Sequence, residues 1–92
     1  MDNKTYKINL NKKLCEYITK RFLSDFDKSK DKNSQNKYAK AVGLTSSTIG
    51  KIAKEEGYNI PVATIALILR YEKVEMDKFF EDFNQYWKKW FF

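Results

Sequence analysis

The chain has 92 residues, a formal net charge of +6 at pH 7, 42% hydrophobic residues and no histidine. This length suits one domain with one modest core, and the basic balance suits a polyanionic partner. The absence of histidine removes the commonest general base and metal ligand, and no phosphate-binding glycine loop or activated nucleophile is evident. We therefore expect neither an enzyme nor a protein that binds a cofactor or a metal.

Cysteine usage and the N-terminal sequence indicate the compartment. Cys15 is the only cysteine, so an intrachain disulfide is impossible, and nothing at the N-terminus resembles a signal peptide or a membrane span. We expect a cytoplasmic protein that makes no membrane contact. Residues 1–9 are polar apart from Tyr6 and Ile8, and we interpret this segment as a flexible arm.

A core helix is predicted to follow the arm from about Leu10. Its apolar residues recur at helical spacing, and Asn9 or Asn11 is available as its N-cap. The stripe consists of Leu10, Leu14, Tyr17, Ile18, Phe22 and Phe26. Cys15 lies beside this stripe, where a small buried packing residue is a better interpretation than a reactive thiol.

Residues 27–33 form a polar, lysine-rich connector without an apolar anchor. The ordinary interpretation is a solvated loop. The functional alternative is that Lys28, Lys30 and Lys32 contact phosphates, an attraction that weakens as salt rises. Residues 28–70 carry eight basic and three acidic groups, a net charge of +5 out of the total of +6. The basic excess therefore lies on this connector and on the segment that follows it.

Residues 34–57 are predicted to form two short helices with a tight joint. The first helix ends at Gly43, a residue type that tolerates the left-handed conformation of a helix C-cap. Ala39 is expected where the two helices approach most closely, Thr45 is a good N-cap for the second helix, and Ile49 anchors that helix in the core. Two helices joined by three or four residues including a glycine form a helix-turn-helix, whose second helix enters the DNA major groove.

This arrangement resembles the helix-turn-helix of the Cro and phage-repressor type. Ala39 stands four residues before Gly43 and Ile49 six residues after it, and the resemblance continues to about Phe80, over half of the chain. It implies a sequence-specific transcriptional regulator that binds double-stranded DNA. The richness of the chain in Asn, Lys, Ile and Phe separately suggests a prokaryotic or phage genome. By this resemblance the protein is a dimeric repressor. The helix that enters the major groove is the second helix of the motif and the third helix of the chain.

The resemblance also assigns roles to individual side chains. Base contacts fall on Thr45, Ser46, Ser47 and Lys51. Among these, Lys51 can donate to guanine O6 and N7, whereas short hydroxyl groups discriminate poorly between bases. Phosphate contacts are implied for Gln35 in the first turn of its helix, and the exposed lysines Lys37, Lys40 and Lys54 could add to them.

Two glycines near this second helix raise separate questions. Gly50 could permit close approach of the helix backbone to DNA, or it could be a tolerated surface glycine. Gly57 is predicted to end the helix, and Glu55 and Glu56 before it suggest that this end tilts away from phosphates.

Pro61 then begins a helix over 61–71 that is apolar nearly all round, which predicts either burial on more than one face or a subunit contact.

The C-terminal segment is rich in aromatic residues. Eight of the fifteen aromatic residues of the chain lie within 76–92, more than a small core can hide. An exposed aromatic patch indicates a protein partner, and a homodimer through Phe83, Trp87, Trp90 and Phe91 is the simplest use of it. The alternative is a second protein bound at this tail, as in an antitoxin or an adaptor.

The sequence thus predicts an all-α fold. We expect a compact bundle of five helices in one domain, 1–92, with a helix-turn-helix at 34–57 and an aromatic extension at 81–92.

Overall fold

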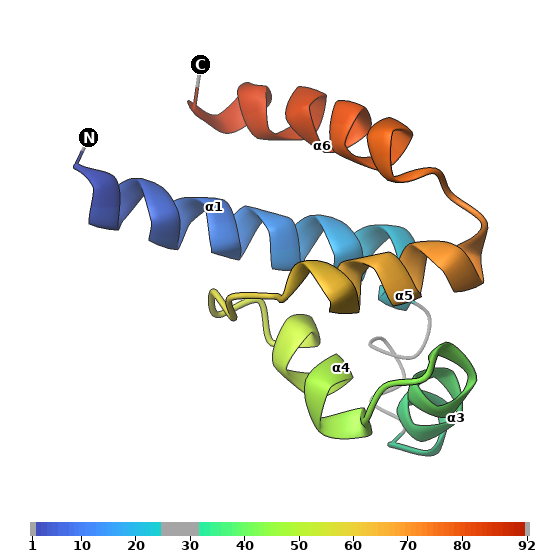
Figure 1. The fold of residues 1–92 in the computed structure, drawn as a ribbon. Coiled ribbons are helices and arrows are strands. Elements are labelled where there is room, and N and C mark those ends of the chain that lie inside the picture. The colour runs from blue at the N-terminus through green and yellow to red at the C-terminus, as the bar shows by residue number, and fades with distance from the viewer. Residues whose placement is uncertain (1, 25–31, 92) are drawn as a thin grey trace.

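The computed structural model describes residues 2–24 and 32–91. Within these ranges the chain forms five α-helices and no strand, which confirms the predicted all-α bundle (Figure 1). The helices are α1 (Asn3–Ile18), α3 (Lys32–Val42), α4 (Ser46–Ala53), α5 (Val62–Glu72) and α6 (Met76–Phe91). α6 runs antiparallel to α1 on one side of it, and α4 packs against α1 on the other (Figure 1). None of the helices in the described ranges is long and apolar enough to cross a bilayer.

The N-terminal segment is helical from Asn3, so the prediction of a flexible arm over residues 1–9 was wrong. α1 begins at Asn3 because the carboxylate of Asp2 accepts a hydrogen bond from the Thr5 amide at 2.7 Å and caps the helix. The ring of Tyr6 packs edge-on against Trp87 of α6, with 5.6 Å between centroids. The cap is therefore Asp2 rather than Asn9 or Asn11.

α1 continues without a break into a π-helical turn, η1 (Thr19–Leu23). In a π-helix the hydrogen bonds join residues five apart, which brings such residues onto one side. Ile18 and Leu23 are five apart, and both are buried. Thr19 is buried as well, and its hydroxyl donates to the carbonyl oxygen of Ile52 in α4 at 3.3 Å. The turn thus fixes the C-terminal end of α4 to the long helix.

The core lies between α1 and the other helices. Cys15 is fully buried, as predicted, and its thiol donates to the carbonyl oxygen of Tyr58 at 3.3 Å. Burial raises the pKa of this thiol to about 11. Of the predicted stripe, Ile18 is buried and Leu14, Tyr17 and Phe22 are half-buried, while Phe26 lies outside the described residues.

α6 buries an aromatic row with four-residue spacing: Phe79, Phe83 and Trp87. Tyr17 of α1 packs against this row, with its ring centroid 5.5 Å from that of Phe79 and 5.6 Å from that of Phe83. Phe83 is 6% exposed and Trp87 only 4%. The prediction that Phe83 and Trp87 are dimer contacts therefore needs correction, because both side chains are buried inside their own chain. The side chains of Trp90 and Phe91 lie outside the described residues.

α5 buries Ile65, Ile68 and Leu69, and Leu67, on the other side of the helix, is half-buried against the core. Val62 is 67% exposed, and Ala63 beside it is exposed too. The helix is therefore not buried all round, although its burial extends beyond the face of Ile65, Ile68 and Leu69. α5 is joined to α3 by Tyr38, whose hydroxyl donates to the Glu72 carboxylate at 2.7 Å. Burial and the neighbouring carboxylate raise the pKa of this hydroxyl far above its ordinary range.

Candidate nucleic-acid interface

The joint between α3 and α4 is made by the residues that the sequence predicted. Gly43 has a φ of +95°, a left-handed conformation that favours glycine. The amides of Gly43 and Leu44 both donate to the carbonyl oxygen of Ala39, at 2.9 and 2.8 Å. These bonds satisfy the last turn of α3 and direct the chain into α4.

Packing then holds the two helices at short range. Ala39 is 1% exposed and Ile49 fully buried, as expected for the closest approach and for the anchor of α4. The Thr45 hydroxyl accepts a hydrogen bond from the Thr48 amide at 3.2 Å and lies 3.0 Å from the Thr48 hydroxyl. Thr45 is therefore the N-cap of α4, and its hydroxyl is engaged in the cap.

The outward side of α4 carries the remaining predicted residues. Gly50 and Lys51 follow Ser47 by three and four positions, and Lys54 follows Gly50 by four, which places these residues on one face of the helix. Ser47, Lys51 and Lys54 are exposed, whereas Ile49 and Ile52 are buried on the opposite side. We call these four residues the outer face of α4.

A hollow of about 380 Å³ joins this face to the start of α3, and it is lined by Gln35, Asn36, Ser46 and Ser47. The side-chain oxygen of Gln35 lies 3.9 Å from the point where a Cβ on Gly50 would stand. The structure therefore brings Gln35 together with Ser46 and Ser47, although they are eleven and twelve positions apart in the chain. Amide and hydroxyl groups that converge in this way can hydrogen-bond an oxygen anion such as a phosphate.

The predicted phosphate-contacting lysines occupy different faces. Lys37 and Lys40 are both exposed on α3. Lys40 follows Asn36 by four positions and so lies on the same side of the helix as the hollow, whereas Lys37, one position after Asn36, does not share that side. Lys28 and Lys30 fall outside the described residues, and the side chain of Lys32 is not described.

The segment that forms this surface carries charges of one sign only, all of them positive. Residues 33–54 contain four lysines and no carboxylate. Within the described ranges, none of these four lysines takes part in a salt bridge. Their ammonium groups are therefore not paired with a carboxylate in the described part of the chain. Glu55 and Glu56 follow directly after α4 and are exposed, so the run of positive charges without a carboxylate ends there.

Two residues near the interface were missed by sequence reasoning. Asn36 lines the hollow, and its four-residue spacing from Lys40 was the available signal. Tyr58 lies under Lys51, whose ammonium group stands 5.5 Å from the centre of the ring. Such a cation–π contact is worth roughly 0.5–1 kcal/mol at an exposed site. No local pattern predicts it, because the loop after α4 must first fold back.

The end of α4 and the loop that follows it differ from the prediction. α4 ends at Ala53, and the chain turns at Glu55, which has a φ of +58°. Gly57, with a φ of +101°, belongs to the loop that packs on α1, where a Cβ would stand 3.3 Å from Cγ of Lys12. The prediction that Gly57 ends the helix was therefore wrong.

In the described part of the chain, no three His, Cys, Asp or Glu side chains come together as metal ligands would.

Comparison of the chain with protein-family models, curated proteins and solved structures finds no match.

Proposed function

We propose that the chain is a sequence-specific regulator of transcription that binds double-stranded DNA, a dimeric repressor of the phage-repressor type with α4 in the major groove. The observation that carries the proposal is the outer face of α4 with its adjoining hollow. This surface is positive, lacks carboxylates and stands on a short helix fixed by a glycine turn. An α-helix fits the major groove, which is about 12 Å wide.

Each group on this surface has a role that its chemistry supports. Ser46 and Ser47 are short, and Gly50 has no side chain, so the backbone of α4 can approach the base edges closely. Lys51 is the strongest base-reading side chain, because it donates to guanine O6 and N7. Its contact with the Tyr58 ring is weak enough to be exchanged for a contact with DNA.

Phosphate binding falls on the hollow and on the lysines around it. Gln35 and Asn36, the fourth and fifth residues of α3, supply side-chain amides that can hydrogen-bond a phosphate oxygen. Lys40 and Lys54 add charge beside it. If Lys40 and Lys54 each neutralise one phosphate, log K should fall with log salt with a slope of roughly −2 for each half-site.

The test is fluorescence anisotropy against the DNA upstream of the gene and against a scrambled duplex of equal length, over a salt series. Lys51→Ala should lower the preference for the upstream DNA, and Gln35→Ala should weaken binding to both duplexes. Lys54→Ala should reduce the salt slope by about one unit. The matched control is Lys88→Ala, which removes the same charge from an exposed position near the end of α6.

Two outcomes would contradict the proposal. If Lys88→Ala weakens binding as much as Lys51→Ala, only overall charge attracts DNA. If the wild-type protein binds neither duplex at low salt, the chain is better described as a protein-interaction module such as an antitoxin or an adaptor.

A further inference from the structure

α1 carries a row of lysines on the side that faces away from α6. Lys7 follows Lys4 by three positions and Lys12 follows it by eight, which places the three on one face of the helix. We call these three residues the basic stripe of α1. All three are exposed, and within the described ranges none of them takes part in a salt bridge. Tyr6 and Tyr17, which pack against α6, lie on the opposite side of the helix.

The loop that follows α4 packs beside this stripe. A Cβ on Gly57 would stand 3.3 Å from Cγ of Lys12. The next residue, Tyr58, accepts the hydrogen bond of the Cys15 thiol at 3.3 Å through its carbonyl oxygen, and its ring lies 5.5 Å from the ammonium group of Lys51. The loop therefore joins the outer face of α4 to the basic stripe of α1, with Lys51 on one side of it and Lys12 on the other.

α1 continues past this loop toward its own beginning (Figure 1). Lys4 stands eight positions before Lys12, which is about 12 Å at 1.5 Å per residue. Ile8, midway between them, is 43% exposed. The described part of the chain thus leaves this length of the helix largely open to solvent.

We propose that the basic stripe of α1 binds the phosphate backbone of the same duplex whose major groove receives α4, as a second contact surface without sequence preference. The inference rests on the proposed function, because it takes that DNA as the polyanion. One strand presents a phosphate about every 3.4 Å along the helix axis, so 12 Å of α1 spans roughly three or four phosphates. The stripe offers three ammonium groups to them, on flexible stems that can adjust to each phosphate.

Carboxylates border the stripe at both ends. Asp2 stands two positions before Lys4, and its carboxylate accepts the capping hydrogen bond of α1. Glu55 and Glu56 stand at the turn between α4 and Gly57. These two carboxylates lower the attraction for phosphates at the turn itself, so the phosphate contacts are assigned to the stripe beyond it.

The first test is the salt dependence of DNA binding by the full chain, measured by fluorescence anisotropy on a duplex of roughly 30 base pairs, about 100 Å long at 3.4 Å per pair. Lys40 and Lys54 alone predict a slope of about −2, whereas three further lysines predict about −4 to −5. The double variant Lys4→Gln, Lys7→Gln should make the slope shallower by about 1.8. Between about 50 and 200 mM salt the wild type should then lose about twelvefold more affinity than this variant. The preference for the upstream duplex over the scrambled one should not change, because phosphate contacts carry no sequence information.

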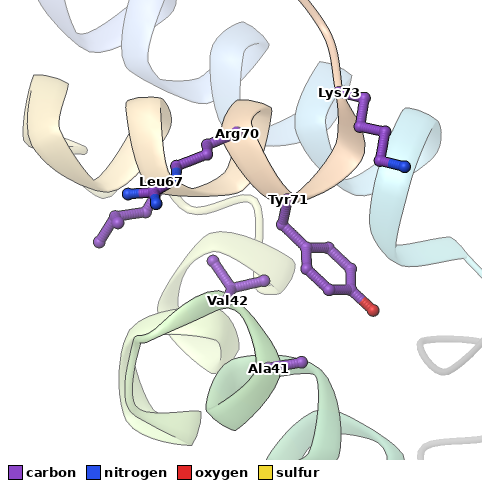
Figure 2. Close-up of a pocket in the computed structure, with 6 residues that line it drawn as sticks. All are labelled: Ala41, Val42, Leu67, Arg70, Tyr71 and Lys73. Carbon is purple, nitrogen blue, oxygen red and sulfur yellow. The ribbon is translucent and has the colours of Figure 1, made fainter.

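The matched control is the double variant Arg70→Gln, Lys73→Gln. It removes the same charge from two exposed residues beside the hollow between α5 and the end of α3, away from Gln35 near the start of α3 (Figure 2). The control should keep the wild-type slope. Circular dichroism of both double variants establishes that each is folded.

A tethered cleavage reagent gives an independent readout of position. Lys7→Cys, Lys54→Cys and Lys73→Cys each provide an exposed thiol for an iron–EDTA reagent, which cuts only DNA that lies close to it. Cys15 is fully buried and should not be labelled. The reagent at positions 7 and 54 should cut the duplex, whereas the reagent at position 73 should not cut it above background.

Four results would overturn the inference while leaving DNA binding intact: a wild-type slope near −2, an unchanged slope in the α1 double variant, an equal loss of slope in the control, or cleavage from position 54 without cleavage from position 7. If the wild-type protein binds neither duplex at low salt, the proposed function and this inference fail together. The failure of the inference alone is therefore distinguishable from the failure of the proposed function.

Discussion

Replacement of Gly50 and Gly43 by alanine should change stability in opposite directions. Gly50 lies inside α4 with a helical backbone, and a Cβ there would find only the Gln35 side chain, at an ordinary contact distance of 3.9 Å. Alanine should therefore add helix propensity without strain, raising the free energy of unfolding by about 0.5–1 kcal/mol. Because a domain of this size gains about 4–8 °C per kcal/mol, Tm should rise by about 2–8 °C.

Gly43 is the matched case with the opposite sign. Its Cβ would meet nothing within 4 Å, so space is not the obstacle, but its φ of +95° is one that alanine rarely adopts. Gly43→Ala should lower the free energy of unfolding by about 1–2 kcal/mol through backbone strain alone. Thermal and urea unfolding followed by circular dichroism at neutral pH measure both variants. A destabilised Gly50→Ala or a neutral Gly43→Ala would refute this reasoning.

The Gly50 variant also separates stability from binding. If the missing side chain serves close approach to DNA, Gly50→Ala should bind DNA more weakly than wild type even though it is more stable. Equal affinity would show that Gly50 is a tolerated surface glycine.

Three further predictions concern the polar contacts inside the bundle. Thr19→Val removes the hydroxyl bonded to the Ile52 carbonyl oxygen and should cost about 0.5–1.5 kcal/mol in urea unfolding, and an unchanged midpoint would argue against this contact. Tyr38→Phe removes the bond to the Glu72 carboxylate and should cost about 1–2 kcal/mol at pH 7, with Tyr71→Phe as the control that leaves this bond intact. The folded Cys15 thiol keeps its proton up to a pKa of about 11, whereas the unfolded chain releases it near 9.0, so wild-type stability should fall between pH 9 and 11. Cys15→Ala should lose less stability over that range, and identical slopes would contradict the assignment.

Local chemistry determined the helices and the joint between two of them. Apolar spacing marks the middle of α1, α3 and α4, and Thr45 and Gly43 act where their own backbones require a cap and a left-handed turn. Such features depend on neighbours within four positions, so they can be read from the sequence. The same holds for the exposure of Ser47, Lys51 and Lys54, because the buried isoleucines between them fix the opposite face.

Tertiary packing decided two features that the sequence pattern did not determine, the start of α1 and the direction in which the aromatic row of α6 points. The first residues of α1 became helical because Asp2 caps them and Tyr6 meets Trp87, a partner 81 positions away. The aromatic row of α6 turned inward because α1 is long enough to cover it, which removed Phe83 and Trp87 from the candidate dimer contacts.

The sequence by itself therefore determined the helical class and the positions of the turn and of the lysines beside it. Only the tertiary structure decided that Val62 and Ala63 of α5 stay exposed and that Gln35 and Asn36 meet the start of α4. The physical reason is the distance along the chain over which each kind of contact acts. Caps, turns and amphipathic stripes are set by contacts within one or two helical turns, whereas burial of a face depends on which distant helix arrives to cover it.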